Sequence, residues 1–189
     1  FMEIYIIRHP EVNEYHKICY GQSDMQITHN ALMAAVERVK ANIPEYSELT
    51  YFSSDLTRCK LLAEKLSAGK ITYSSSLREI NFGNWELKNW NDIPEEEVNY
   101  WMEDYVNRKS PGGESYMDLY TRVIKYWNEL ITKDYEKIAV VVHGGVIRSI
   151  LSNALDMPMK SAFKFKLDFG GVSKIVINDE LVTVEFINK

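Results

Sequence analysis

Two histidines of this chain follow directly after its two most strand-like stretches. His9 comes after Arg8, at the end of the apolar run at residues 4–7, and His143 comes after the run at residues 138–142. The carboxyl ends of parallel strands meet at one edge of a sheet, where α/β proteins bind their ligands. We therefore expect these two imidazoles and the Arg8 guanidinium to lie together. Such a group suits an oxyanion.

Further groups are expected at the same edge. Gly144-Gly145 opens a helix, whose first backbone N–H groups can bind an anion. Arg58 lies near the start of another helix, after the run at residues 49–53, where a cation is unfavourable unless an anion is bound. Glu79 follows the strand-like residues 71–74. Singly, these side chains could be a solvated arginine and a surface glutamate, but together they would surround a phosphate.

The elements that must position these groups follow from hydrophobic spacing. Buried strands are predicted near residues 4–7, 49–53, 71–74 and 138–142, helices near 28–44, 56–66, 95–107, 116–132 and 146–155, and antiparallel strands at 163–169 and 174–186. The segment from Leu77 to Pro94 is predicted to be a loop folded over the sheet edge. The pattern indicates one α/β domain over residues 2–189, a three-layer αβα sandwich with a mostly parallel central sheet.

Composition excludes several other classes of protein. The chain has 189 residues, 46% of them hydrophobic, and a net charge of −5 with both signs mixed, which is untypical of nucleic-acid or membrane binding. It shows no spanning run, no signal segment and no metal-ligand spacing, so we expect a cytoplasmic protein without metal or other cofactor. Cys19 and Cys59 are expected to be reduced thiols, and the alternative for Cys19 is a nucleophile. Met2 is the expected natural start, after Phe1.

Several segments in order resemble the histidine phosphatase superfamily, also called phosphoglycerate mutase-like. The matching segments are Arg8-His9, Ser53–Arg58, Leu77–Glu86, Pro111–Ser115 and His143–Arg148. Within that superfamily, residues 19–24, 77–86 and 111–115 are most similar to α-ribazole phosphatases. Those enzymes remove the 5′-phosphate from α-ribazole 5′-phosphate during assembly of the cobalamin nucleotide loop.

The resemblance implies a role for each matched residue. His9 would attack phosphorus and become a phosphohistidine, while Arg8, Arg58 and His143 would hold the phosphoryl oxygens, with Gly144 beside them. Glu79 would protonate the leaving oxygen and later deprotonate the attacking water. Phosphoryl transfer of this kind depends mainly on positioning and charge stabilisation, so the arginines can take the place of a metal ion.

Two residues depart from the family pattern. Pro10 replaces the glycine that usually follows the nucleophilic histidine. Tyr15 replaces an asparagine found in many of the mutases, which argues against mutase activity.

Recognition of the leaving group is assigned to Gln22, Ser23 and Trp85, with core packing as the alternative for Trp85. The leading hypothesis is a phosphomonoesterase acting on α-ribazole 5′-phosphate. The alternatives are a phosphoglycerate mutase or broad sugar-phosphate phosphatase, and a non-catalytic module that binds a phosphate ligand. The edge of a C-terminal hairpin is a place where two chains could pair as a homodimer.

Overall fold

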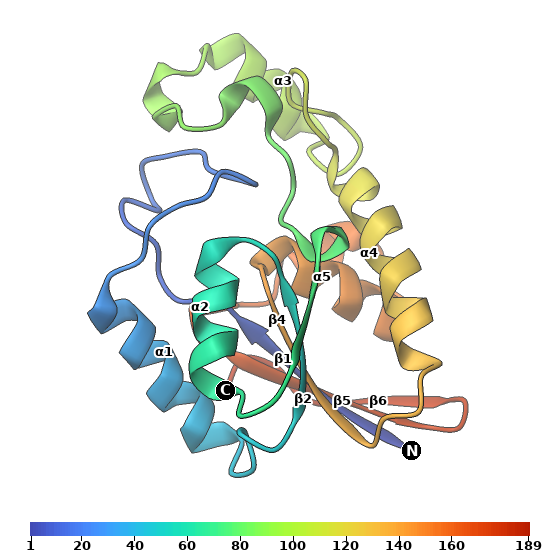
Figure 1. Cartoon of the computed structure of the whole chain (residues 1–189). Helices are drawn as coiled ribbons and strands as arrows, with labels where there is room; N and C mark the ends of the chain where they lie inside the picture. The colour runs from blue at the N-terminus through green and yellow to red at the C-terminus, as the bar shows by residue number, and fades with distance from the viewer.

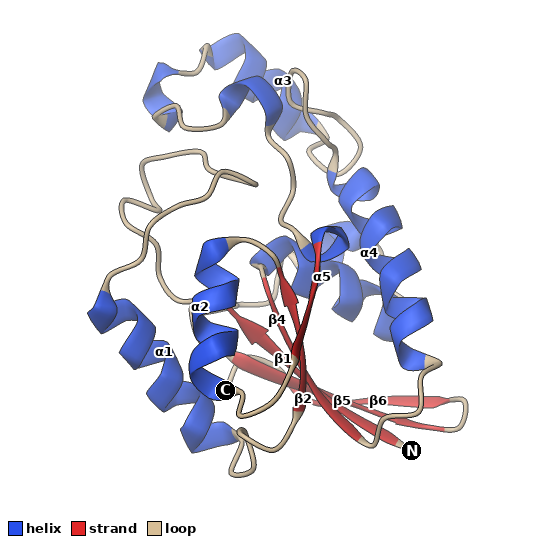
Figure 2. Ribbon diagram, viewed as in Figure 1, coloured by secondary structure: helices blue, strands red, loops and turns tan.

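A computed structural model describes all 189 residues, and a six-stranded sheet runs through its centre (Figures 1 and 2). The strands are β1 (Met2–Arg8), β2 (Thr50–Ser54), β3 (Ile71–Ser74), β4 (Lys137–Val142), β5 (Val172–Asn178) and β6 (Leu181–Phe186). Their order across the sheet is β3-β2-β4-β1-β5-β6. The first four of these are parallel, and β5 and β6 are antiparallel to their neighbours. The predicted mostly parallel sheet is confirmed.

Helices cover both faces of this sheet. They are α1 (His29–Asn42), α2 (Thr57–Leu66), α3 (Glu95–Glu103), α4 (Tyr116–Ile131), α5 (Gly144–Ala154) and α6 (Met159–Ala162). Side chains alternate along β1, so Ile4 and Ile6 pack in the core beneath α4 and α5, whereas Tyr5 and Ile7 pack beneath α1 and α2. These side chains are at most 5% exposed. Two cores on opposite faces confirm the three-layer arrangement.

Short-range hydrogen bonds set the helix starts that the sequence indicates. The Thr28 side chain accepts a hydrogen bond from the Ala31 backbone N–H at 3.0 Å at the start of α1. Ser115 and Asp118 form a reciprocal capping box at the start of α4, with bonds of 3.1 and 2.9 Å. Both helices therefore begin where the hydrophobic spacing predicts.

The segment between β3 and α4 forms a cap above the carboxyl edge of the sheet, at the top of Figure 1. It contains three single 3-10 turns, η1 (Ser75–Leu77), η2 (Gly83–Trp85) and η3 (Trp90–Asp92), as well as α3. Gly83 has φ +56°, and a Cβ added there would lie 2.4 Å from the Pro111 carbonyl oxygen. Only glycine allows the two loops of the cap to approach so closely.

The strand predicted at residues 163–169 is wrong. This segment makes turns after α6, and the Phe165 N–H donates to the Ala162 carbonyl at 3.3 Å. The carbonyl oxygens of Phe165 and Leu167 accept from the side chains of Arg148 and Arg8 instead of from a strand. The alternation of apolar and charged residues therefore reflects packing of one side of this segment against the protein, and the segment does not pair as a strand.

The C-terminal hairpin is formed by β5 and β6, and it turns at Asp179-Glu180. Strand β6 is an edge of the sheet, and Leu181 on it is 67% exposed. Pairing of two chains at this edge stays a prediction.

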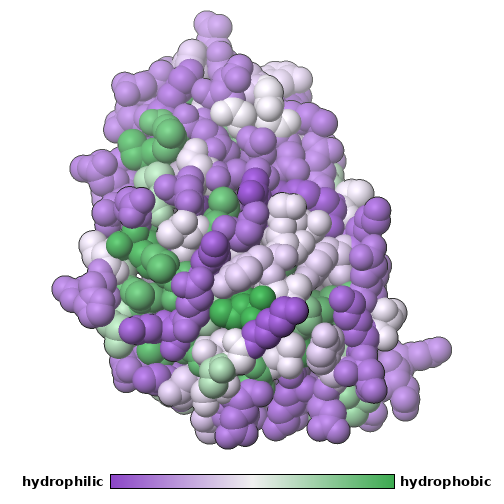
Figure 3. Space-filling model, viewed as in Figure 1, coloured by the Kyte–Doolittle hydropathy of each residue, from purple (hydrophilic) through white to green (hydrophobic).

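The face of the molecule shown in Figure 3 is mostly hydrophilic, with hydrophobic side chains in small patches that polar groups separate. None of the helices combines the length and the apolar character needed to cross a membrane.

Candidate active site

The two predicted histidines meet at the carboxyl edge of the sheet. Strands β1 and β4 are parallel neighbours, with Arg8 opposite Val142, so both strands deliver the next residue to the same place. The rings of His9 and His143 lie with their centroids 5.1 Å apart, and both side chains are almost fully buried. The predicted juxtaposition is confirmed.

The environment of His9 keeps its imidazole neutral and selects one tautomer. Burial, together with the charges of Arg58 and Arg8, lowers its pKa well below the usual value. Its Nδ1 lies 2.7 Å from the Pro10 carbonyl oxygen. A neutral ring can contact that acceptor only with a protonated Nδ1, which leaves the lone pair on Nε2. Proline in place of glycine therefore still supplies the carbonyl that orients this ring.

His143 lies against one residue of the adjacent strand β2 and one residue of α2. Its Nε2 lies 2.8 Å from Ser54 Oγ and 3.4 Å from Cys59 Sγ. Its pKa is well below the usual value because of burial and the nearby charge of Arg58. Ser54 was missed in the sequence, although it ends β2 and the strand-end argument applied to the histidines would have found it.

The two cysteines are unsuited to nucleophilic chemistry. Both are free, and burial raises the thiol pKa of Cys19 and of Cys59 to about 12. The thiolate is the reactive form, so these side chains are inert at neutral pH.

Arg8 and Arg58 carry charges that no carboxylate within 4 Å balances. Arg58 is fully buried and donates to the carbonyls of Gly21 at 2.5 Å and Ser23 at 2.8 Å. Arg8 donates to the Leu167 carbonyl, and its Cζ lies 4.0 Å from the centre of the Phe169 ring. The Nε atoms of both arginines are buried without a hydrogen-bond partner. A phosphoryl oxygen would satisfy such donors.

Glu79 approaches the start of α5 from the cap. Its Oε1 accepts from the Ile80 N–H at 2.9 Å, and its Oε2 accepts from the Gly145 N–H at 3.0 Å. One predicted backbone donor therefore holds this carboxylate. At Gly144 an added Cβ would lie 3.7 Å from Arg8 Nε, so that residue borders the arginine as expected.

We expect the Gly145→Ala variant to lose about 10²-fold in kcat on an alkyl phosphomonoester. The new Cβ would lie 2.3 Å from Glu79 Oε1 and 2.8 Å from Leu119 Cδ2, which forces the carboxylate out of place. The resemblance implies that Glu79 is the catalytic acid, and misplacing such an acid by about 1 Å costs a factor of this size. Steady-state kinetics beside the Gly69→Ala variant measure the effect, because nothing lies within 4 Å of a Cβ at Gly69. Equal kcat values for the two variants would contradict the assigned position of Glu79.

A cavity of about 220 Å³ opens beside Glu79 under the cap. It is lined by Tyr15, Ile18, Tyr20, Gly21, Glu79, Ile80, Phe82, Trp90 and Tyr116. Glu79 is the only charged residue in this lining, and aromatic rings make up much of the wall. Loops from two separate parts of the chain, which the isolated bridge between Ile18 and Asn89 joins, form most of the lining, and Tyr116 of α4 completes it.

The three residues assigned to the leaving group in the sequence lie outside the lining of this cavity. Trp85 is 1% exposed, packs against Trp90 and Trp101 and donates to Glu97 at 2.8 Å, so the packing alternative is correct for it. Gln22 donates to the Glu79 carbonyl at 3.0 Å, and Ser23 donates to the Glu86 carboxylate. Direct contact of Gln22 or Ser23 with a ligand stays a prediction. Tyr20, Trp90 and Tyr116 were missed because their spacing resembles ordinary core packing.

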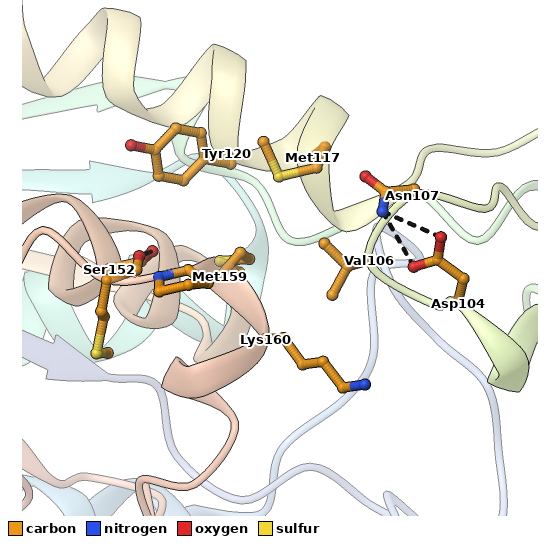
Figure 4. Close-up of a pocket in the computed structure, with 10 residues that line it drawn as sticks. Asp104, Val106, Asn107, Met117, Tyr120, Ser152, Met159 and Lys160 are labelled. Atoms are coloured by element: carbon orange, nitrogen blue, oxygen red, sulfur yellow. Dashed lines mark hydrogen bonds between the residues drawn. The ribbon is translucent and has the colours of Figure 1, made fainter.

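A separate hollow of about 410 Å³ lies between α4, the end of α5 and α6 (Figure 4). Two of its polar side chains already have partners, since Ser152 donates to the Met157 carbonyl at 2.5 Å and Asn107 donates to Asp104 at 3.0 Å. None of the residues predicted for chemistry faces it. In the whole chain, no group of three His, Cys, Asp or Glu side chains is placed to hold a metal ion.

The family model of the histidine phosphatase superfamily (branch 1) matches residues 4–189. The chain belongs to this superfamily. Among curated proteins, it is 28% identical over 149 residues to the adenosylcobalamin/α-ribazole phosphatase of Escherichia coli K12, covering 72% of this chain and 73% of that protein. The predicted superfamily is thereby confirmed.

Solved structures of histidine phosphatases share the whole fold. The α-ribazole phosphatase from Shigella flexneri has a TM-score of 0.87 at 23% identity, with 100% of this chain and 96% of that chain covered. The phosphoserine phosphatase from Entamoeba histolytica, in complex with 3-phosphoglyceric acid, has a TM-score of 0.83 at 19% identity, covering 100% and 98%. Enzymes named for different substrates thus share this architecture, and the fold alone does not identify the substrate.

Proposed function

We propose that this histidine phosphatase hydrolyses phosphomonoesters through a phosphohistidine at His9, and that α-ribazole 5′-phosphate is its substrate. The observation that carries the proposal is the state of His9, a buried neutral imidazole whose Nδ1 is held by the Pro10 carbonyl beside two unbalanced arginines. A neutral nucleophile next to positive charge suits attack on a dianion.

The reaction proceeds in two displacements. Nε2 of His9 attacks phosphorus, and the bond from phosphorus to the ester oxygen breaks while Glu79, entering protonated, gives its proton to that oxygen. Arg8, Arg58 and His143 face the charge on the remaining phosphoryl oxygens. In the second step, the Glu79 carboxylate takes a proton from water, whose oxygen attacks the phosphohistidine. The bond from phosphorus to nitrogen breaks, and phosphate leaves.

The cavity beside Glu79 favours an uncharged, flat leaving group. Tyr15, Tyr20, Trp90 and Tyr116 line it, and aromatic side chains stack well on a planar base. The lining contains no Lys or Arg to pair with a carboxylate. Phosphoserine and 3-phosphoglycerate both carry a carboxylate, which would lie unpaired there. This supports the ribazole ester over those two esters.

The test is kcat/KM in EDTA for α-ribazole 5′-phosphate beside p-nitrophenyl phosphate, ribose 5-phosphate, phosphoserine and 3-phosphoglycerate. We expect the ribazole ester to be preferred by about 10²-fold or more, which corresponds to ~3 kcal/mol of leaving-group recognition. A flat profile would keep the phosphohistidine mechanism and reject the substrate.

Two other outcomes would favour the alternatives. Isomerisation of 3-phosphoglycerate after phosphohistidine priming would indicate a mutase. Binding of a phosphate ligand with neither turnover nor a trappable phosphoenzyme would indicate a non-catalytic module.

A further inference from the structure

Arg122 of α4 makes five hydrogen bonds with the loop that carries Glu79 and with Glu114. Its Nη1 donates to the carbonyls of Ser76 at 3.0 Å and Arg78 at 2.8 Å. Its Nη2 donates to the carbonyl of Glu79 itself at 2.8 Å. Three carbonyls of one short loop thus converge on one guanidinium, which has the rigid planar set of donors that such an arrangement needs.

Glu114 completes the arrangement from the loop before α4. Its carboxylate forms a bidentate ion pair with Arg122. The Nε of Arg122 donates to Oε1 at 2.8 Å, and its Nη2 donates to Oε2 at 2.9 Å. Oε2 also accepts from the Asn81 N–H at 2.9 Å, and the Glu114 N–H donates to the Asn81 carbonyl at 2.7 Å. The chain is therefore fixed on both sides of Glu79.

These contacts leave Glu79 little freedom. Its backbone carbonyl is held by Arg122, and its carboxylate is held by Gly145, at the start of the helix that follows His143. Arg122 and Glu114 are both about three-quarters buried, at 23% side-chain exposure. A buried, doubly hydrogen-bonded ion pair keeps its geometry much better than an exposed one.

We propose that Arg122, clamped by Glu114, is a positioning residue that sets the catalytic acid Glu79 over the leaving oxygen. The inference rests on the proposed function. It predicts a leaving-group-dependent defect, because an alkoxide must be protonated as it departs, whereas nitrophenolate departs without help. Loss of the clamp should therefore lower kcat/KM for an alkyl phosphate ester and spare that for p-nitrophenyl phosphate.

The experiment compares kcat/KM for glycerol 2-phosphate and p-nitrophenyl phosphate, since this constant reports steps up to phosphoryl transfer. We expect the Arg122→Met variant to lose about 10²-fold on the alkyl ester and less than about fivefold on the aryl ester. Arg122→Lys keeps the charge but cannot reach the same acceptors, so it should recover only part of the loss. Glu114→Gln loosens the clamp more gently and serves if Arg122→Met does not fold.

The matched control is Arg38→Met. Arg38 has 30% side-chain exposure, donates to the carbonyls of Phe169, Asn188 and Lys189 and faces Asp168 at 3.7 Å, without touching the Glu79 loop. It should leave the ratio of the two kcat/KM values unchanged. A second test adds Arg122→Met to Glu79→Gln, where it should cause no further loss on the alkyl ester, because residues that act as one unit are not additive.

Equal losses on both esters, or additive losses in the double variant, would overturn the positioning role and leave Arg122 as a structural residue. Failure of the proposed phosphomonoesterase activity would look different, because the unmodified protein would then hydrolyse neither ester.

Discussion

The His9→Ala variant is expected to lose phosphomonoesterase activity by about 10⁴-fold or more and to form no phosphoenzyme. In the proposed mechanism the unprotonated Nε2 of His9 accepts the phosphoryl group, and alanine has no atom that could do so. Activity is measured with p-nitrophenyl phosphate in EDTA. The intermediate is sought by rapid acid-free quenching and mass spectrometry, since a phosphorus–nitrogen bond is labile in acid.

The matched control for this variant is His29→Ala, because His29 is an exposed histidine at the start of α1. It should retain full activity. A phosphoenzyme in the His9→Ala variant, or activity close to that of the unmodified protein, would show that another residue is the nucleophile.

The Arg58→Met variant is also expected to show a large effect. We expect it to lose about 10²–10³-fold in kcat/KM. Arg58 lies fully buried at the first turn of α2, and its charge lowers the pKa of both site histidines. Methionine fills a similar volume but offers no charge to the phosphoryl oxygens. It would also release the carbonyls of Gly21 and Ser23, which the guanidinium now binds.

We expect Arg58→Met to change the free energy of unfolding much less than it changes kcat/KM. The lost hydrogen bonds destabilise the folded state, but removing a buried charge that lacks a carboxylate partner stabilises it, so the two contributions oppose each other. Inorganic phosphate should raise the melting temperature of the unmodified protein and leave that of the variant unchanged. Arg108→Met, which alters an arginine bound to Tyr100 and Glu103 in the cap, is the control. An equal phosphate-induced shift in Arg58→Met would refute the assigned contact.

Much of the site could be predicted because strand ends are easy to find in a sequence. Arg8, His9 and His143 follow apolar runs directly, and their register in a parallel sheet fixes where they meet. Ser115 and Asp118 likewise lie within one turn of each other, so local spacing predicts their bonds.

The remaining features depend on contacts between distant parts of the chain. Arg122 binds carbonyls more than forty positions away, and nothing in its helix distinguishes it from a surface arginine. Trp85 and Trp90 have similar neighbours in sequence, yet the first is buried and the second faces the cavity. The alternation at residues 163–169 predicts a strand, but whether a backbone forms a ladder depends on neighbours that the pattern does not contain.

The two halves of the site are built from different kinds of structure, and this difference has an evolutionary consequence. The residues proposed to bind the phosphate lie at or just after the ends of β1, β2 and β4. A shift of these strands would disturb both hydrophobic cores. The wall of the cavity comes from loops near residues 15–21 and 80–90, whose exchange would leave the sheet intact. Mutations can therefore accumulate in those loops and redirect the enzyme to new esters while its chemical step is inherited unchanged.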